Sequence, residues 1–269
     1  MNNNIKYWEV LKINGDEFNR ELAIAFLEQF HCGVHDKKDS SEIFFNKVDK
    51  KHIEMIIKNK SNISRWEWNK VEKQDWNKFW KPFFKNIEIK NKVAIIPSWE
   101  KIHPDNDKIV IKIEPGMAFG TGHHETTAMM IEGIINYLEK GMNVLDVGSG
   151  SGILSILSKK MGADKILSID NDIEVVENFN SNLKLNNISI ELKVIDCLDI
   201  KDFNYNVILA NLNKQILLDF IPNIPSNNNL LIISGILVDD FKVIKEFLKK
   251  FEILEVLKKN EWLCLIIRT

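Results

Sequence analysis

Hydrophobic positions near the N-terminus of the chain repeat with two different spacings. Residues 7–13 (YWEVLKI) alternate between apolar and polar side chains, which predicts a β-strand. Residues 16–30 (DEFNRELAIAFLEQF) carry apolar side chains at helical spacing after the capping residue Asp16, which predicts a helix. The same criteria predict a hairpin, a second helix and a further strand, at residues 31–48, 50–59 and 63–71.

The resulting order of elements, βαββαβ, is that of a ferredoxin-like α+β domain. We therefore expect residues 1–72 to form a small domain of this kind. Residues 73–105 are expected to form a linker with an aromatic cluster and one or two short strands. Composition also changes along the chain, because six of the seven tryptophans precede residue 100, whereas all but two of the 12 glycines lie from residue 116 onward.

From residue 106 onward, strand and helix patterns alternate. Strands that alternate with helices pair in parallel, and the helices then cover both faces of the sheet. Residues 252–269 form two strands joined by the short turn KKNE, so these two must pair antiparallel. We expect residues 106–269 to fold as an α/β, Rossmann-like αβα sandwich with an antiparallel C-terminal hairpin. The buried strands are predicted at residues 143–148, 165–170, 190–196, 205–211 and 230–235.

Charge and cysteine content narrow the functional classes. The 269 residues carry a formal net charge of −2 without an obvious basic stripe, so direct binding of nucleic acid is not expected. Cys32, Cys197 and Cys264 form no CxxC pair, which argues against a zinc ribbon or a disulfide framework. No apolar run approaches membrane-spanning length, so we expect a cytoplasmic protein without membrane contact.

A glycine-rich turn follows the strand that ends VLDV. It reads Gly148-Ser149-Gly150-Ser151-Gly152 and leads directly into a predicted helix, so backbone amides and the helix N-terminus are available to a ligand. A dinucleotide fingerprint would need a third glycine at position 153, which is Ile153. The observed GxGxG spacing instead favours S-adenosylmethionine as the cofactor, with contacts at Gly148 and Gly150.

Acidic residues follow the next two strands. Asp170 closes the strand ILSID, where its carboxylate would accept hydrogen bonds from both ribose hydroxyls of the cofactor. Asp172 is expected to be the N-cap of the following helix. Asp196, after the third strand, lies either near the adenine amine or in a plain turn, and the residues do not decide between these two roles.

The fourth strand ends at Asn211, at the edge where ligands bind in open parallel sheets. Its amide carbonyl would accept a hydrogen bond from a substrate amine and aim the nitrogen lone pair at the cofactor methyl group. The alternative is an asparagine that caps the helix starting near Asn213. The Pro-Pro-aromatic sequence typical of enzymes acting on planar amides is absent after Asn211, which argues against such substrates. We predict Asn211 as the catalytic residue.

The segment GMAFGTGHHETTAMM concentrates three glycines, two histidines and three threonines. It contains no lysine, so it is not a phosphate-binding Walker loop. His123 and His124 are neighbours, and on a helix they would point about 100° apart. HExxH is also absent, and we predict no metal site here.

This segment is best interpreted as a lid over the cofactor. Gly120 and Gly122 allow its backbone conformations that other residues disfavour, and Thr121 and Thr127 supply polar groups. We expect the lid to bring Phe119, Thr121 and Thr127 to the cofactor.

Four blocks together resemble the PrmA family of class I methyltransferases. They are PGMAFGTGHHETT, VLDVGSGSGIL, IDND and ILANL, and IIPSWE and a late SGIL also look like family blocks. The resemblance covers roughly residues 64–240. The family's usual GTGTHPTT is GTGHHETT in this chain, with His123 in place of threonine and Glu125 in place of proline.

The resemblance implies a protein-lysine N-methyltransferase that uses S-adenosylmethionine. It implies cofactor contacts at Thr127, Gly148, Asp170 and Asn211. The protein substrate would be large-subunit ribosomal protein L11, bound by the N-terminal domain and methylated on lysine side chains and its α-amino group. Three alternatives stay open, namely another target for the same fold, an NAD-dependent oxidoreductase and a non-catalytic binding module.

Overall fold

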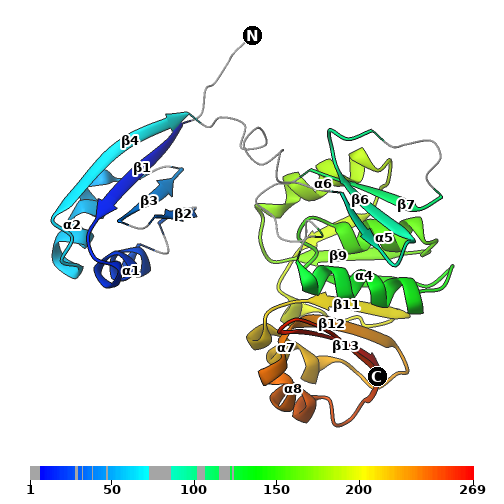
Figure 1. Cartoon of the computed structure of the whole chain (residues 1–269). Helices are drawn as coiled ribbons and strands as arrows, with labels where there is room; N and C mark the ends of the chain where they lie inside the picture. The colour runs from blue at the N-terminus through cyan, green and yellow to red at the C-terminus, as the bar shows by residue number, and fades with distance from the viewer. Residues whose placement is uncertain are drawn as a thin grey trace. The chain divides into compact units, whose positions relative to one another are not determined.

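The structure, a computed structural model, divides into two compact units, Met1–Pro82 and Phe83–Thr269 (Figure 1). It describes residues 7–27, 30–31, 33–37, 39–46, 48–72, 86–101, 107–114, 122 and 124–269. Each unit has its own hydrophobic core. Within the described ranges, no helix is long and apolar enough to cross a membrane.

The first unit has the predicted order of elements around an antiparallel sheet. Its strands are arranged β2-β3-β1-β4, and each neighbouring pair is antiparallel. Its elements are β1 (Tyr7–Asn14), α1 (Glu17–Phe26), β2 (Gly33–Asp36), β3 (Ser40–Phe45), α2 (Lys50–Lys60) and β4 (Arg65–Glu72).

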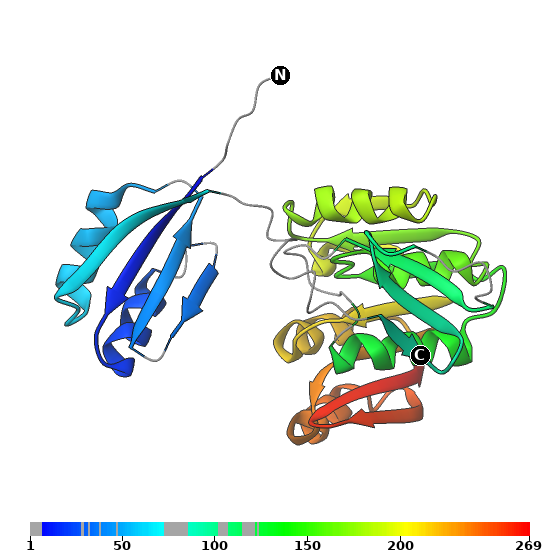
Figure 2. The same ribbon diagram turned by 45° about the horizontal axis from the view of Figure 1, so that its top comes forward.

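The core of the first unit lies on one face of that sheet. Side chains alternate across a strand, so Leu11 and Ile13 of β1 point to the same side as Ile43 of β3. These three residues are fully buried and pack with Ile53 and Ile57 of α2. Both helices of this unit cover the apolar face, as Figure 2 shows.

The second unit is built on a seven-stranded sheet with the order β10-β9-β8-β11-β12-β14-β13. The five strands from β10 to β12 are parallel, and β14 and β13 are antiparallel to their neighbours. The strands are β8 (Val144–Val147), β9 (Ile166–Asp170), β10 (Glu191–Val194), β11 (Val207–Asn211), β12 (Leu230–Leu237), β13 (Glu252–Lys259) and β14 (Trp262–Arg268).

Helices cover both faces of this sheet. Consecutive residues of one strand are buried in two different cores, one on each face of the sheet, as Val144 and Leu145 of β8 are. On one face lie α4 (Glu125–Tyr137), α5 (Ile153–Lys160) and α6 (Val175–Leu185), and on the other lie α7 (Lys214–Phe220) and α8 (Phe241–Phe247). The arrangement is the expected layered α/β fold.

The expected linker contains strands that belong to the second unit. β5 (Ile87–Ile89), β6 (Val93–Pro97) and β7 (Ile109–Ile113) form a small sheet of their own. Ile95 and Ile111 are buried in the same core as Met129 of α4 and Ile153 of α5. The boundary that we placed at residues 105/106 therefore cuts through a packed sheet, because these short strands bury their apolar side chains against the helices.

Candidate functional site

The glycine turn lies at the carboxyl end of β8, in the middle of the parallel strands. Gly148 has a φ angle of 71°, which favours glycine. A Cβ atom on Gly148 would lie 2.3 Å from Cδ2 of Leu212, so a side chain would also collide with the segment that follows β11. The turn therefore favours glycine for its backbone conformation, and any larger residue would also have to displace the Leu212 side chain.

The carboxylate of Asp170 holds this turn in place. The backbone N–H of Gly150 donates to Oδ2 of Asp170 at 2.9 Å, and the N–H of Asp172 donates to Oδ1 at 3.0 Å. Each carboxylate oxygen keeps a second lone pair that can accept from a ligand hydroxyl. The end of β9 and the glycine turn thus form one polar unit.

The expected capping role of Asp172 needs correction. Its Oδ1 accepts from the N–H of Glu174 at 2.8 Å, but α6 begins later, and its N-cap is Glu174. Asp172 therefore closes the turn that precedes the helix, because an aspartate readily accepts from the backbone two residues on.

A cavity of about 220 Å³ lies beside the turn. Gly148, Asp170 and Asp196 line it together, so the structure brings these three residues into one place. Asp196 accepts from the backbone N–H of Leu198 at 2.9 Å, and its place at the cavity leaves the adenine-contact interpretation open. Small-molecule sites usually begin at roughly 300 Å³, so this cavity would hold one part of a cofactor. Its remaining lining is mainly apolar, with Ile169, Asn171, Ile195, Cys197, Leu198, Leu212, Ile216 and Asp219.

The thiol of Cys197 is not a reactive group in this cavity. Burial and, as the smaller cause, the neighbouring Asp196 carboxylate together raise the pKa of Cys197 to about 11. The nucleophilic form of cysteine is the thiolate. The thiol therefore stays protonated at neutral pH, and nothing here favours a cysteine-based mechanism.

Asn211 lies at the carboxyl end of β11 and contacts the start of α4. Its Nδ2 lies 3.3 Å from Oγ1 of Thr126 and 3.4 Å from Oγ1 of Thr127. Asn211 does not cap α7. The N-cap of that helix is Asn213, whose side chain accepts from the N–H of Ile216. The structure thus brings Asn211 and Thr127 together.

Two of the predicted cofactor contacts cannot be placed. Phe119 and Thr121 lie outside the described residues, as does His123. Gly122 and the start of α4 are described, and Thr126 and Thr127 are both buried there. The contacts expected from Phe119 and Thr121 stay predictions.

Asp146 is a buried acid that the sequence analysis gave no role. The hydroxyl of Ser155 donates to its Oδ2 at 2.5 Å, and Ser155 also contacts the hydroxyl of Ser168 at 2.7 Å. Burial raises the pKa of the Asp146 carboxyl to about 6. Among the described residues, Oδ1 of Asp146 and the buried hydroxyl of Ser149 have no hydrogen-bond partner. Unpaired buried oxygens are costly, so these two beside the glycine turn fit a polar ligand at this place.

Asn182 in α6 connects the glycine turn to the small sheet. It is fully buried, its Oδ1 accepts from the N–H of Glu114 at 2.7 Å, and its Nδ2 donates to the carbonyl of Ser151 at 2.9 Å. Asn186, one turn later, accepts from and donates to the backbone of Lys112. The sequence analysis did not identify Asn182 or Asn186. A polar residue on the inward face of a predicted amphipathic helix is the pattern that could have identified Asn182.

The late SGIL block also has a structural reason. Gly235 has a φ angle of 90° at the point where the pairing of β12 with β14 shifts register. A Cβ atom there would lie 2.0 Å from the carbonyl oxygen of Leu212. Leu212 thus lies against two glycines, Gly148 and Gly235, directly after Asn211.

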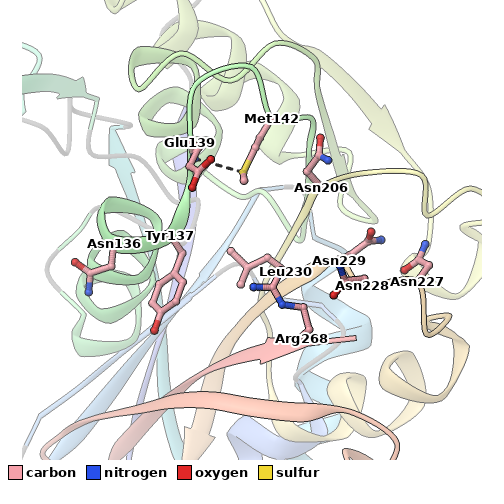
Figure 3. A pocket seen from close by; sticks show the side chains of 10 residues that line it. All are labelled: Asn136, Tyr137, Glu139, Met142, Asn206, Asn227, Asn228, Asn229, Leu230 and Arg268. Carbon is pink, nitrogen blue, oxygen red and sulfur yellow. Dashed lines mark hydrogen bonds between the residues drawn. The ribbon is translucent and has the colours of Figure 1, made fainter.

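A second cavity, of about 440 Å³, lies at the opposite edge of the sheet (Figure 3). Asn206 and Leu230 of its lining mark the amino ends of β11 and β12. None of the residues predicted to bind a cofactor line it. Within the described part of the chain, no three histidine, cysteine, aspartate or glutamate side chains are placed to hold a metal ion.

An open parallel sheet with a glycine turn and acidic strand ends at its carboxyl edge defines a mixed α/β protein of the methyltransferase type. The family model "Ribosomal protein L11 methyltransferase (PrmA)" matches residues 8–269. The chain therefore belongs to this family, and the resemblance seen in the sequence is confirmed.

Individual relatives agree with the family match. The chain is 36% identical over 95% of its length to a ribosomal protein L11 methyltransferase of Dictyoglomus turgidum, of which it covers 83%. A second relative, from Caldicellulosiruptor saccharolyticus, is 38% identical over 84% of this chain and 76% of its own length. A crystal structure described as ribosomal protein L11 methylase from Lactobacillus delbrueckii subsp. bulgaricus matches 68% of this chain and 98% of its own, with a TM-score of 0.64 and 34% identity.

Proposed function

We propose that this protein transfers methyl groups from S-adenosylmethionine to lysine side chains and the α-amino group of ribosomal protein L11. The observation that carries the proposal is the convergence of the Gly150–Asp170 hydrogen bond and the Asn211 amide at the carboxyl edge of one sheet. Membership of the L11 methyltransferase family supports the choice of substrate.

The cofactor site that we propose consists of the glycine turn, the end of β9 and the start of α4. Asp170 would accept from the ribose hydroxyls, and Gly148 and Gly150 would let the cofactor approach the backbone closely. Thr127 would contribute its hydroxyl from α4. Phe119 and Thr121 complete the predicted set.

The Asn211 side chain would orient the nucleophile. Bound S-adenosylmethionine supplies an electrophilic methyl group, and a neutral amine must meet it in line. A lysine ammonium has a reference pKa of about 10.4, and burial beside a sulfonium lowers it, so the proton leaves to water before attack. Asn211 Oδ1 then accepts a hydrogen bond from the amine and aims its lone pair. Such orientation contributes up to about 7–11 kcal/mol of barrier lowering.

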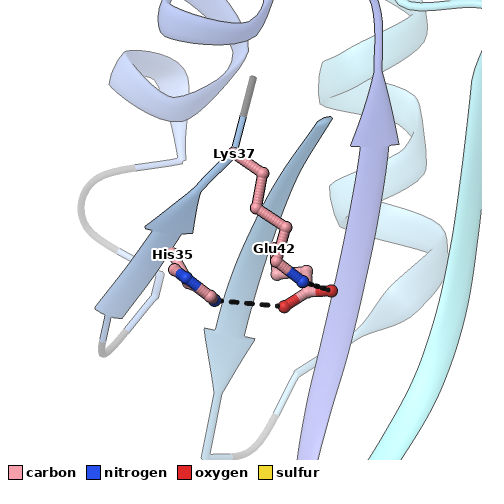
Figure 4. A network of polar contacts seen from close by, with 3 residues as sticks. All are labelled: His35, Lys37 and Glu42. Carbon is pink, nitrogen blue, oxygen red and sulfur yellow. Dashed lines mark hydrogen bonds and ion pairs between the residues drawn. The ribbon is translucent and has the colours of Figure 1, made fainter. Parts of the chain in front are cut away.

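The first unit, which we classify as a ferredoxin-like domain, would recognise the protein substrate. The sheet face opposite its helices carries Trp8 and Phe44, whose ring centroids are 6.1 Å apart, and the exposed Val71. On the same face His35 and Lys37 both pair with Glu42 (Figure 4). A surface with an apolar centre and a charged margin is typical of a protein-binding site.

The alternative is a methyltransferase of the same fold that acts on another protein or on a small-molecule amine. No direct contact with nucleic acid or membrane is part of the proposal, and the expected cytoplasmic location stays a prediction.

Mass spectrometry of L11 after incubation with the enzyme and S-adenosylmethionine tests the function. We expect mass increases in steps of one methyl group on lysines and the N-terminus, and loss of about 100-fold in rate for Asn211→Ala. Cofactor binding without any mass increase would reject L11 as the substrate. Full turnover by Asn211→Ala would reject the orienting role of that residue.

A further inference from the structure

The N-terminus of α4 is capped by an unusual residue. His124 has extended backbone angles, φ −76° and ψ 142°, and its Nδ1 accepts from the backbone N–H of Thr126 at 3.3 Å. Serine, threonine, aspartate and asparagine are the preferred caps. Because Nδ1 accepts this hydrogen bond, it carries a lone pair, and the neutral imidazole holds its proton on Nε2.

The same nitrogen also determines how the Thr126 hydroxyl is oriented. Oγ1 of Thr126 lies 2.8 Å from Nδ1 of His124. The single lone pair of Nδ1 is shared by the backbone N–H and the hydroxyl of Thr126, and the hydroxyl, at the shorter distance, donates its one proton to it. Only lone pairs of Thr126 Oγ1 are then left for other partners.

The consequence reaches Asn211. A group that approaches Thr126 Oγ1 at 3.3 Å must be a donor, so the amide of Asn211 presents Nδ2 and not Oδ1. Its second contact, 3.4 Å to Oγ1 of Thr127, involves the same nitrogen. Without a fixed proton on Thr126, both hydroxyls could instead donate to Oδ1 of a flipped amide, and Oδ1 would then be lost to a substrate.

The C-terminal hairpin holds the histidine ring. The ring of Trp262, the first residue of β14, lies edge-on to that of His124 with a centroid distance of 5.0 Å. Glu125 accepts from Nδ2 of Asn260, which lies in the turn before β14, at 3.0 Å. Two contacts thus attach the first turn of α4 to the hairpin.

We propose that His124 and Thr126 are positioning residues that fix the direction of a hydrogen-bond chain, from Asn211 through Thr126 to His124, and so keep Asn211 Oδ1 available to the substrate amine. The inference rests on the orienting role proposed above for Asn211. It gives His124 a specific task, whereas the sequence assigned this residue none. Neither residue needs to touch the substrate.

Two matched substitutions at Thr126 test the chain. Thr126→Val keeps the shape of the buried side chain and removes the hydroxyl, whereas Thr126→Ser keeps the hydroxyl. We expect Thr126→Val to lower kcat for L11 methylation about tenfold or more, while the Kd for S-adenosylmethionine stays within about threefold. Thr126→Ser should retain kcat within about threefold of the wild type.

Unchanged kcat in Thr126→Val would overturn the proposal. Parallel losses of kcat, cofactor affinity and thermal stability in both variants would also overturn it, because they would show a packing role only. An inactive wild type, or an active Asn211→Ala, would instead count against the proposed function.

The tautomer of His124 gives a readout that does not need activity. Long-range proton–nitrogen correlation spectra of the full chain, assigned with His124→Asn, should show the His124 proton on Nε2 and an unprotonated, hydrogen-bonded Nδ1. A proton on Nδ1 would contradict the proposed direction of the chain, whatever the substrate proves to be.

Discussion

The two edges of the large sheet each carry a cavity, and the smaller cavity is the better candidate site. The amino edge holds about 440 Å³ lined by several asparagines and Arg268, and the carboxyl edge holds about 220 Å³ lined by Gly148 and Asp170. Only the carboxyl edge combines a glycine turn, strand-end carboxylates and the Asn211 amide. Topology explains this, because ligands of open parallel sheets bind where the strands end. Chemistry and position therefore locate the site better than size does.

The largest expected effect is on the free energy of unfolding, and it distinguishes alanine substitutions at two glycines with similar backbone angles. Gly148 and Gly141 have φ angles of 71° and 87°, but a Cβ on Gly141 meets nothing within 4 Å. We expect Gly141→Ala to cost about 1–2 kcal/mol of unfolding free energy, for its backbone angle alone. Gly148→Ala should cost up to about 1–3 kcal/mol more, because its methyl group forces the Leu212 side chain to move. Denaturant unfolding measures both, and equal losses would contradict the steric account.

The next effect concerns the cofactor. Asp170→Asn removes a charged acceptor and turns one amide nitrogen towards a backbone N–H, of Gly150 or of Asp172. We expect the Kd for S-adenosylmethionine to rise about 10- to 100-fold, the scale of one or two charge-assisted hydrogen bonds. Isothermal titration calorimetry is the measurement. An affinity within twofold of the wild type would remove Asp170 from the proposed site.

A smaller effect depends on pH and belongs to the buried Asp146. Its pKa of about 6 in the folded protein exceeds the ordinary value of 3.8, so the folded state binds this proton more tightly than the unfolded state. Unfolding free energy is therefore lost as pH rises through this interval. Relative to Asp146→Asn, the wild type should lose about 1–2 kcal/mol between pH 5 and pH 8. A constant difference across that range would show that burial does not shift the group.

The smallest effect is expected at the amino edge. Arg268 lines the larger cavity, far along the strands from the glycine turn. Arg268→Ala should leave both cofactor affinity and methylation rate within about twofold of the wild type, since surface substitutions usually change little. A large loss of cofactor affinity would indicate that the cofactor binds at the amino edge of the sheet and not at the carboxyl edge.

Local patterns predicted the glycine turn, the parallel strands and the residues at their ends. These features are encoded within a few consecutive residues, and the rule for open sheets then places them together. The sequence does not predict that β5, β6 and β7 form a sheet of their own, because a short apolar segment becomes a strand only through the residues against which it packs. For β7 those partners include Asn182 and Asn186, some 70 residues further along the chain.

The hydrogen-bond chain at α4 lay beyond sequence analysis for a similar reason. Asn211 and Thr126 are separated by 85 positions, and only the sheet brings them within 3.3 Å. The role of Gly235 depends on a backbone carbonyl that no local pattern indicates. Long-range contacts of this kind decide how a predicted residue is oriented, whereas local sequence decides where along a strand it lies.

Hydrogen–deuterium exchange of the wild-type chain, with and without S-adenosylmethionine, shows directly which edge of the sheet binds the cofactor. We expect the cofactor to slow amide exchange at residues 148–152 and 211–213, and to leave exchange unchanged at residues 227–230 of the amino edge. Protection at residues 227–230, with none at the glycine turn, would contradict the claim that the carboxyl edge is the cofactor site.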